Sequence, residues 1–298
     1  MNDARDGLLR TLAFHHVWAH APTRAEWIAT AEVHSACSIE ELDAAMEDLV
    51  RTKTVLYTLG RYAFDEAIIT SLRERELFYP RKIRVARRAA RWLASLSSVR
   101  FVALCNTTAL GHGDDASDLD FFVVTRAGSI MATRAVSALP YKLLHRRPDE
   151  SGSERDAICL SYFISDAGLD LSAHMVPEDD PYFRYWFLSL LPLYDDGVSC
   201  DLWAANARIT FRHPFAKPWV VPPDLIVRPR FRIPIPPLTE SLATRVQTAA
   251  FPPSIQDIMN RDTRVLVSPR VLKFHVNDRR EHFRDQFLEF CRSRGIAS

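Results

Sequence analysis

Two apolar runs separated by a polar turn constrain the fold of this chain more than any other feature. Residues 99–105 are apolar and favour a β-strand, residues 106–117 are polar and contain two glycines, and residues 118–125 begin with acids before a second apolar run. This pattern predicts two strands joined by a turn. Because side chains alternate across a strand, Asp118 and Asp120 should point to the same face.

The pair Asp118 and Asp120 is the strongest candidate for chemistry. Two carboxylates at positions i and i+2 of a strand can share one or two hard divalent cations. Mg²⁺-dependent phosphoryl or nucleotidyl transfer requires such a pair, since the cations neutralise the triphosphate and stabilise the leaving pyrophosphate. The opposite face carries Leu119, Phe121 and Val123, which we expect to be buried.

Composition places this pair in a globular protein, and the order of the strands and helices predicted along the chain makes it α/β (α+β). The chain has 298 residues, of which 47% are hydrophobic, enough for one large core or two smaller ones. No apolar run reaches the roughly 20 residues that span a bilayer, and residues 1–10 lack the apolar segment of a secretory signal. We therefore expect a cytoplasmic protein. The five cysteines lie far apart, which favours free thiols over a zinc site or disulfides.

Residues 1–70 predict a small helical module that ends in a hairpin. Capping boxes at residues 23–26 and 38–41 mark two helix starts, and a glycine divides the apolar residues 55–64 into two short strands. Three helices followed by a hairpin form the winged-helix pattern. The third helix carries five acidic side chains, which does not suit a helix that faces phosphates. A protein-packing role is therefore favoured over DNA binding.

An amphipathic helix is predicted over residues 80–97, with a basic outer face. That face carries Arg84, Arg87, Arg88 and Arg91. Residues 72–91 together contain eight Lys or Arg against two Glu. Two interpretations remain open, a solvated face, which is the commoner case, and a surface that binds phosphates or RNA beside the neighbouring site.

In the core region, residues 71–175, the two strands around the polar turn are followed by a further helix and further strands. A helix is predicted over residues 129–145, a strand over 158–164 and, after a turn, another strand over 169–171.

Residues 176–298 predict a mostly helical C-terminal part with an extended arm. Helices are expected over residues 181–193, 239–249 and 279–294. Residues 214–237 hold eight of the 18 prolines, which excludes regular helix or a central strand there. Because this segment is also rich in large apolar residues, it should wrap on the core as an extended arm.

The segment around Asp118 resembles the nucleotidyltransferase superfamily that includes the DNA polymerase β fold. The usual pattern there is Gly-Ser, a gap, and then Asp-hydrophobic-Asp on the next strand. In this chain residues 106–107 are Asn-Thr in place of Gly-Ser, and residues 118–120 match the second half. The order of winged-helix-like module, basic helix, Asp-x-Asp core, the strand at 159–163 and the Ala-Asn pair at 205–206 is similar to a group of bacterial nucleotidyltransferase-domain proteins.

This resemblance implies a nucleotidyltransferase-like mixed sheet and an activity. The expected enzyme moves a nucleoside monophosphate from an NTP to a small molecule, a protein or an RNA end, with Mg²⁺ as cofactor. Asp118 and Asp120 would be the catalytic metal ligands. The nucleotide would be bound by Asn106, Thr107, Thr108 and Ser117. Neither DNA nor a membrane is an expected partner.

Two departures from the family pattern leave an alternative open. Asn106 carries a side chain where glycine lets the backbone approach the triphosphate. The family's third carboxylate falls at Ser161, which cannot replace an acid, and Asp156 is the nearest substitute as a third metal ligand. Strand parity places Asp156 on the other face unless a bulge intervenes. The alternative is a catalytically degenerate protein that binds nucleotides or acts as a regulatory scaffold.

Overall fold

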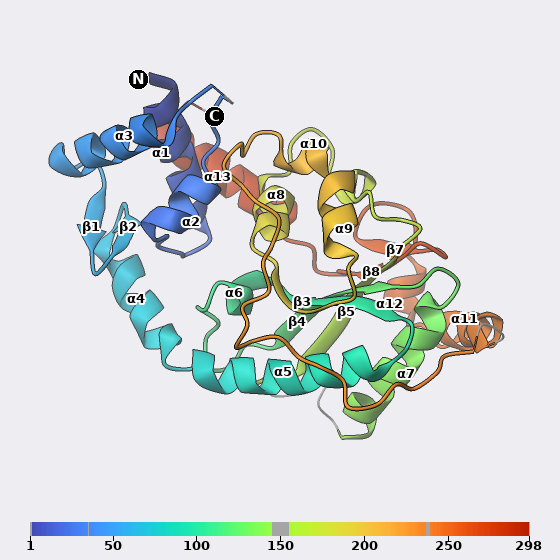
Figure 1. Cartoon of the computed structure of the whole chain (residues 1–298). Helices are drawn as coiled ribbons and strands as arrows, with labels where there is room; N and C mark the ends of the chain where they lie inside the picture. The colour runs from blue at the N-terminus through green and yellow to red at the C-terminus, as the bar shows by residue number, and fades with distance from the viewer. Residues whose placement is uncertain (1, 35, 145–154, 237–238, 298) are drawn as a thin grey trace.

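A six-stranded mixed sheet forms the centre of the molecule (Figure 1). A computed structural model describes the whole chain except residues 1, 35, 145–154, 237–238 and 298. The strand order is β6-β3-β4-β5-β8-β7. The strands are β3 (Val99–Leu104), β4 (Leu119–Thr125), β5 (Ile158–Ser165), β6 (Leu191–Asp195), β7 (Val265–Val267) and β8 (Val271–Phe274). The predicted mixed α/β class is confirmed.

Only β4 and β5 run parallel among the paired strands of the described sheet, and the other neighbours are antiparallel. The two strands on either side of the acidic turn, β3 and β4, pair directly as predicted. In the parallel pair Asp120 lies opposite Cys159. This register places the acidic start of β4 beside the start of β5.

Helices cover both faces of the sheet, and Figure 1 shows them above and below it. One face packs on α5 (Tyr79–Ser95) and α7 (Ile130–Leu143), and the other on α8 (Pro181–Leu188) and α9 (Ser199–Ala205). The three apolar side chains expected on the buried face of β4, Leu119, Phe121 and Val123, belong to the first of these cores. The remaining helices near the sheet are α6 (Asn106–Ala109), α10 (Ala207–Thr210), α11 (Thr239–Ala249), α12 (Pro253–Gln256) and a 3-10 turn at Ser172–His174.

The N-terminal region consists of helices and one hairpin. It contains α1 (Asn2–Val17), α2 (Arg24–Ala29), α3 (Ile39–Arg51), β1 (Leu56–Thr58), β2 (Arg61–Ala63) and α4 (Glu66–Glu76). Both predicted capping boxes are present, with Thr23 before α2 and Ser38 before α3. The element order therefore agrees with three helices and a hairpin.

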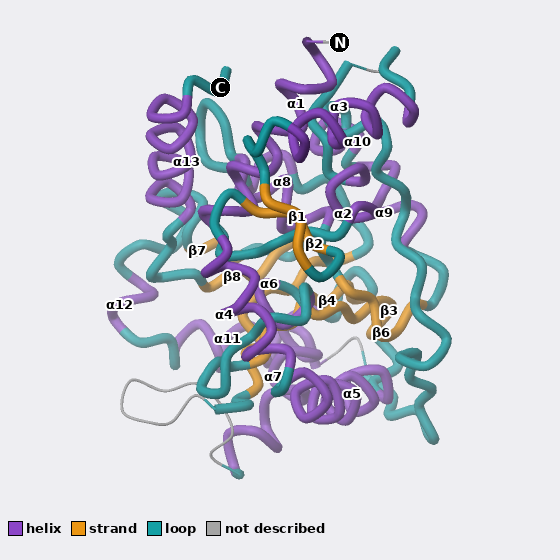
Figure 2. Tube along the Cα trace, turned by 90° about the vertical axis from the view of Figure 1, so that its left-hand side faces the viewer, coloured by secondary structure: helices purple, strands orange, loops and turns teal. Residues whose placement is uncertain are grey.

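The last helix, α13 (Arg280–Arg294), returns to the start of the chain. Its buried side chains Phe287 and Cys291 join the core formed by α1, α2 and α3. The Nε of Arg10 donates a hydrogen bond to the carbonyl oxygen of Ala297 at 2.8 Å. Both termini consequently lie at the same end of the molecule (Figures 1 and 2).

The proline-rich segment is an extended arm packed on the body, as its composition predicts. The Nε1 of Trp219 donates to the carbonyl of Phe187 at 3.1 Å, and the amide of Ile233 donates to the carbonyl of Ser95 at 2.7 Å. These contacts tie the arm to both helical layers.

Several predicted elements are wrong or incomplete. Residues 169–171 are not a strand, and β5 pairs with β8 instead. The helix expected over 181–193 ends at Leu188, and β6 starts at Leu191. The strands β7 and β8 and the helix α4 were not predicted. Both missed strands are short, with three and four residues, and β8 joins the sheet through the remote strand β5, so local periodicity does not show them. Of the helix predicted over 129–145, the last residue lies outside the described residues.

Among the helices of the described residues, none is long and apolar enough to cross a membrane.

Candidate functional site

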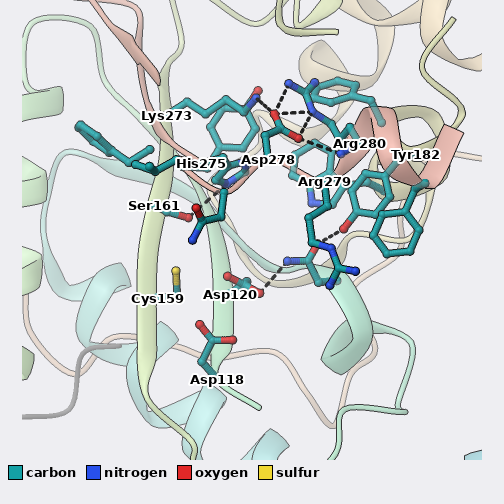
Figure 3. A pocket seen from close by; sticks show the side chains of 18 residues that line it. Asp118, Asp120, Cys159, Ser161, Tyr182, Lys273, His275, Asp278, Arg279 and Arg280 are labelled. Atoms are coloured by element: carbon teal, nitrogen blue, oxygen red, sulfur yellow. Dashed lines mark hydrogen bonds and ion pairs between the residues drawn. The ribbon is translucent and has the colours of Figure 1, made fainter. Parts of the chain in front are cut away.

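A cavity of about 490 Å³ opens at the acidic start of β4 (Figure 3). Its floor comes from the start of β4 and from β5, and its walls come from α8, β8, the loop after β8 and the first turn of α13. This volume falls within the range of small-molecule sites.

The floor brings together Asp118, Asp120 and Cys159. Their oxygen and sulfur ligand atoms all lie within 4.8 Å of one another, and all three side chains are half-buried. Strand alternation and the parallel register explain this, because Asp118 and Asp120 share a face and Cys159 lies opposite Asp120. Burial, followed by the carboxylates of Asp120 and Asp118, raises the pKa of the Cys159 thiol. The cluster therefore presents two carboxylates and a neutral thiol.

Asn106 holds one of these carboxylates in place. Its Nδ2 donates to Oδ2 of Asp120 at 2.6 Å, and its Oδ1 accepts from the hydroxyl of Tyr182 at 3.2 Å. Burial, with a smaller effect of Asp120, raises the pKa of the Tyr182 phenol, so the hydroxyl stays protonated and can donate. Asn106 has a φ of 59°, a left-handed conformation that asparagine adopts more readily than most residues.

The wall opposite the floor is a network of buried charges. Asp180 caps α8 by accepting the amide of Phe183 at 2.9 Å. The guanidinium of Arg280 joins two carboxylates, contacting Asp180 at 3.0 Å and Asp278 at 2.6 Å. Burial alone would raise the pKa of Asp278, but the Arg280 guanidinium holds it below its usual value.

Lys273 completes this wall. Its ammonium group donates to the carbonyl of Thr263 at 2.6 Å and lies 3.8 Å from Asp278. Burial, with a further contribution from the Arg280 charge, lowers the pKa of Lys273 to about 7. The charges of this wall are thus largely satisfied by one another.

Arg279 differs from its neighbours in the wall. It is exposed, lies at the start of α13 and places its guanidinium 5.6 Å from the ring centroid of Phe283. Within the described part of the chain no ion pair involves it. Figure 3 shows its side chain extending toward the end of the cavity that holds Asp120.

A neutral pair, Ser161 and His275, also lines the cavity. The Oγ of Ser161 lies 3.3 Å from Nε2 of His275, and both side chains line the cavity. Burial and the nearby Lys273 charge lower the pKa of His275 to about 3, so the imidazole is neutral near pH 7.

The structure brings some of the predicted site residues together and separates others. Asn106, Asp118 and Asp120 line the cavity, whereas Thr107, Thr108 and Ser117 are not among its lining residues. Ser117 instead supplies a carbonyl that accepts from Nζ of Lys82 at 2.6 Å.

Asp156 lies outside the floor cluster. Its carboxylate accepts from Nη2 of Arg81 at 3.3 Å and from Nζ of Lys82 at 3.2 Å. Both partners come from the first turn of α5. The parity argument from the sequence already placed Asp156 on the other face of β5, and this carboxylate secures α5 to the entry of that strand.

The cavity wall formed by residues 273–283 was not predicted from the sequence. It carries no recognisable motif, and its only visible signal is a dense run of charges at 278–281. The contact between Arg280 and Asp180 joins residues a hundred positions apart. Compared with protein-family models, with curated proteins and with solved structures, the chain shows no match.

Proposed function

We propose that this cavity binds a nucleoside triphosphate with a divalent cation and transfers the nucleoside monophosphate to an acceptor. The observation that carries the proposal is the convergence of Asp118 and Asp120 on the cavity floor, at the end toward which Arg279 extends. Paired carboxylates next to an uncommitted guanidinium suit a ligand that carries both phosphates and a cation.

The donor set fits Mg²⁺. This ion is commonly held by one or two carboxylates and completes its coordination with water and substrate phosphates. The thiol of Cys159 is a soft donor and, being protonated, does not compete for a hard ion. When bound, the cation would neutralise phosphate charge and stabilise the leaving pyrophosphate.

The chain's own groups would orient the substrate. Arg279 would bind phosphate oxygens in a bidentate manner, and the aromatic side chains of Tyr182 and Phe283 would offer surfaces for the base. Asn106 would keep the Asp120 carboxylate in one orientation. In the reaction an acceptor hydroxyl, amine or phosphate attacks the α-phosphorus, the bond to the β-phosphate oxygen breaks, pyrophosphate leaves and any acceptor proton passes to solvent.

A pyrophosphate-release assay with each NTP, Mg²⁺ and pools of small-molecule, protein and RNA acceptors tests the proposal. The double variant Asp118→Asn/Asp120→Asn should lose turnover while keeping its fold. Asp201→Asn, on the exposed surface of α9, is a matched control and should release pyrophosphate at the wild-type rate. Turnover that is undiminished in the double variant contradicts the assignment.

A second candidate function is nucleotide binding without transfer, in a regulatory or scaffold protein. Two observations favour it: the amide of Asn106 already occupies one oxygen of Asp120, and Asp156 is committed to Arg81 and Lys82. Calorimetry with the four NTPs and Mg²⁺ separates the two candidates. Tight binding with no pyrophosphate released supports the second candidate, and turnover excludes it.

A further inference from the structure

A groove lined by arginines lies between α5 and the proline-rich arm. Its volume is about 200 Å³. The lining residues are Arg88, Arg91, Trp92, Ser95, Arg230 and Phe231. It belongs to the helical layer on the face of the sheet opposite to α8, so it is separate from the cavity described above.

Among the described residues no carboxylate forms an ion pair with the arginines of this region. Arg88 and Arg91 of α5 and Arg230 of the arm line the groove, and Arg84, Arg87, Arg228 and Arg232 lie on the same two segments. No ion pair between any of them and a carboxylate occurs in the part of the chain that the structure describes. By contrast, Arg81 and Lys82 in the first turn of the same helix are paired with Asp115 and Asp156.

Acidic residues are also scarce around the groove. The helix α5 contains none, and the arm contains only Asp224. Asp224 does not line the groove, and its carboxylate, after burial, contributes to the raised pKa of the Tyr79 phenol at the start of α5. An excess of unpaired arginines on one surface attracts a polyanion.

The groove is held in shape by backbone contacts. The amide of Ile233 donates to the carbonyl of Ser95, and the amide of Ser97 donates to the carbonyl of Ile233 at 2.8 Å. The guanidinium of Arg232 donates to the carbonyl of Ala94 at 3.1 Å and to the hydroxyl of Tyr194 at 2.6 Å. Since the arm is already fixed against α5, little ordering has to accompany ligand binding.

Aromatic rings lie among these arginines. Phe231 is 60% exposed at the rim, and Trp92 is half-buried with its Nε1 donating to the carbonyl of Ser137. Proteins that bind single strands combine basic side chains along the nucleic-acid backbone with aromatic rings on which the bases stack. In a duplex the base faces are stacked on one another, so only an unpaired strand can use Phe231 in this way.

From this combination we infer that the groove between α5 and the arm binds single-stranded nucleic acid, with phosphates on Arg88, Arg91 and Arg230 and a base on Phe231. The inference rests on the charges and rings of this surface and holds whether or not the cavity transfers a nucleotide. A physical link to the cavity exists, because Lys82 of α5 donates to the carbonyl of Ser117, next to Asp118.

Fluorescence anisotropy with labelled oligouridylate and oligothymidylate tests the inference on the full chain. Neutralising three phosphates predicts that affinity falls about twentyfold between about 50 and about 200 mM salt. The variant Arg88→Glu/Arg230→Glu should weaken binding more than about tenfold, and Phe231→Ala should weaken it about fivefold or more. The two oligonucleotides together show whether the sugar matters.

Matched variants and competing polyanions complete the experiment. Arg51→Glu/Arg292→Glu makes the same change in net charge at exposed positions on α3 and α13 and should bind like the wild type. The inference is overturned by equal binding in the groove variant, by an unchanged affinity after Phe231→Ala, or by binding of polyglutamate or phosphatidylserine vesicles in preference to both oligonucleotides. Because no NTP is present, these results are independent of the pyrophosphate assay.

Discussion

The floor and the wall of the cavity use the same residue types in opposite ways. In the wall, Asp180 is buried, the side chain of Asp278 is only 8% exposed, and the two share the guanidinium of Arg280. On the floor, Asp118 and Asp120 are half-buried and converge on each other and on a thiol. Buried charge pairs fix a structure, whereas carboxylates that converge on the floor of a cavity suit the ligand proposed above. The comparison therefore relates the wall to stability and the floor to the proposed binding.

The largest expected effect comes from removing the shared cation of the wall. Arg280→Ala leaves the carboxylates of Asp180 and Asp278 buried without their partner, which should lower the free energy of unfolding by about 3–5 kcal/mol. Urea denaturation measures this, and Arg280→Lys keeps a charge if the alanine variant does not fold. Arg24→Ala, which breaks a solvent-exposed pair with Asp43, should change stability little.

The wall should also make stability depend on pH through Lys273. Its pKa is about 7 in the folded protein and about 10.4 in an unfolded chain, so the unfolded state binds more protons between these values. The free energy of unfolding should then rise from about pH 7 to about pH 10, by up to about 1.4 kcal/mol per pH unit. Urea titrations at several pH values measure the slope. Lys273→Met should flatten it, and an equal slope in that variant contradicts the prediction.

On the floor, a single substitution should affect ligand binding and spare stability. Asp120→Asn should weaken Mg²⁺ or Mn²⁺ binding at least tenfold, about 1.4 kcal/mol, without lowering the free energy of unfolding. Asp278→Asn should do the reverse, because it disrupts the pair with Arg280 and leaves the floor intact. Calorimetry and urea denaturation on both variants measure the contrast. Equal effects of the two variants on cation binding would remove the distinction between wall and floor.

The smallest expected effect concerns Asn106. Glycine adopts its left-handed backbone conformation readily, so Asn106→Gly should mainly lose the hydrogen bonds to Asp120 and from Tyr182, which together should cost about 1 kcal/mol. Asn106→Ala should cost about 1 kcal/mol more, since alanine does not favour that conformation. Thermal or urea unfolding of the two variants provides the comparison, and an alanine variant as stable as the glycine one contradicts it.

The shared face of Asp118 and Asp120 could be predicted from the sequence, whereas Cys159 beside them and the wall could not. The alternation of Asp118, Leu119 and Asp120 fixes which side chains share a face, and that information lies within three residues. Capping boxes before α2 and α3 likewise depend on residues three apart. The wall requires β8 to pair with β5 and Arg280 to reach Asp180, and such non-local contacts leave no periodic signal in the chain.

The same dependence on non-local contacts explains why some residues predicted to bind the nucleotide or the metal do not line the cavity. Thr107 and Thr108 follow Asn106 closely in sequence, but α6 begins at Asn106 and turns the later residues away from the cavity lining. Ser117 and Asp156 serve the attachment of α5 through Lys82. The sequence could show that these residues suit a phosphate or a metal ion. It could not show that Ser117 and Asp156 instead bind Lys82 of α5.

The return of α13 to α1 has a consequence for how the protein is made. During synthesis α1 emerges long before α13, and the side of its core that receives Phe287 and Cys291 stays unfilled until that helix follows. The strand β8 and Arg280 are synthesised equally late. The strands β3, β4 and β5 can therefore pair well before the wall of the cavity is complete. The cavity can therefore form only after α13 has been synthesised, and a product terminated before β8 would carry the two floor aspartates without the cavity wall around them.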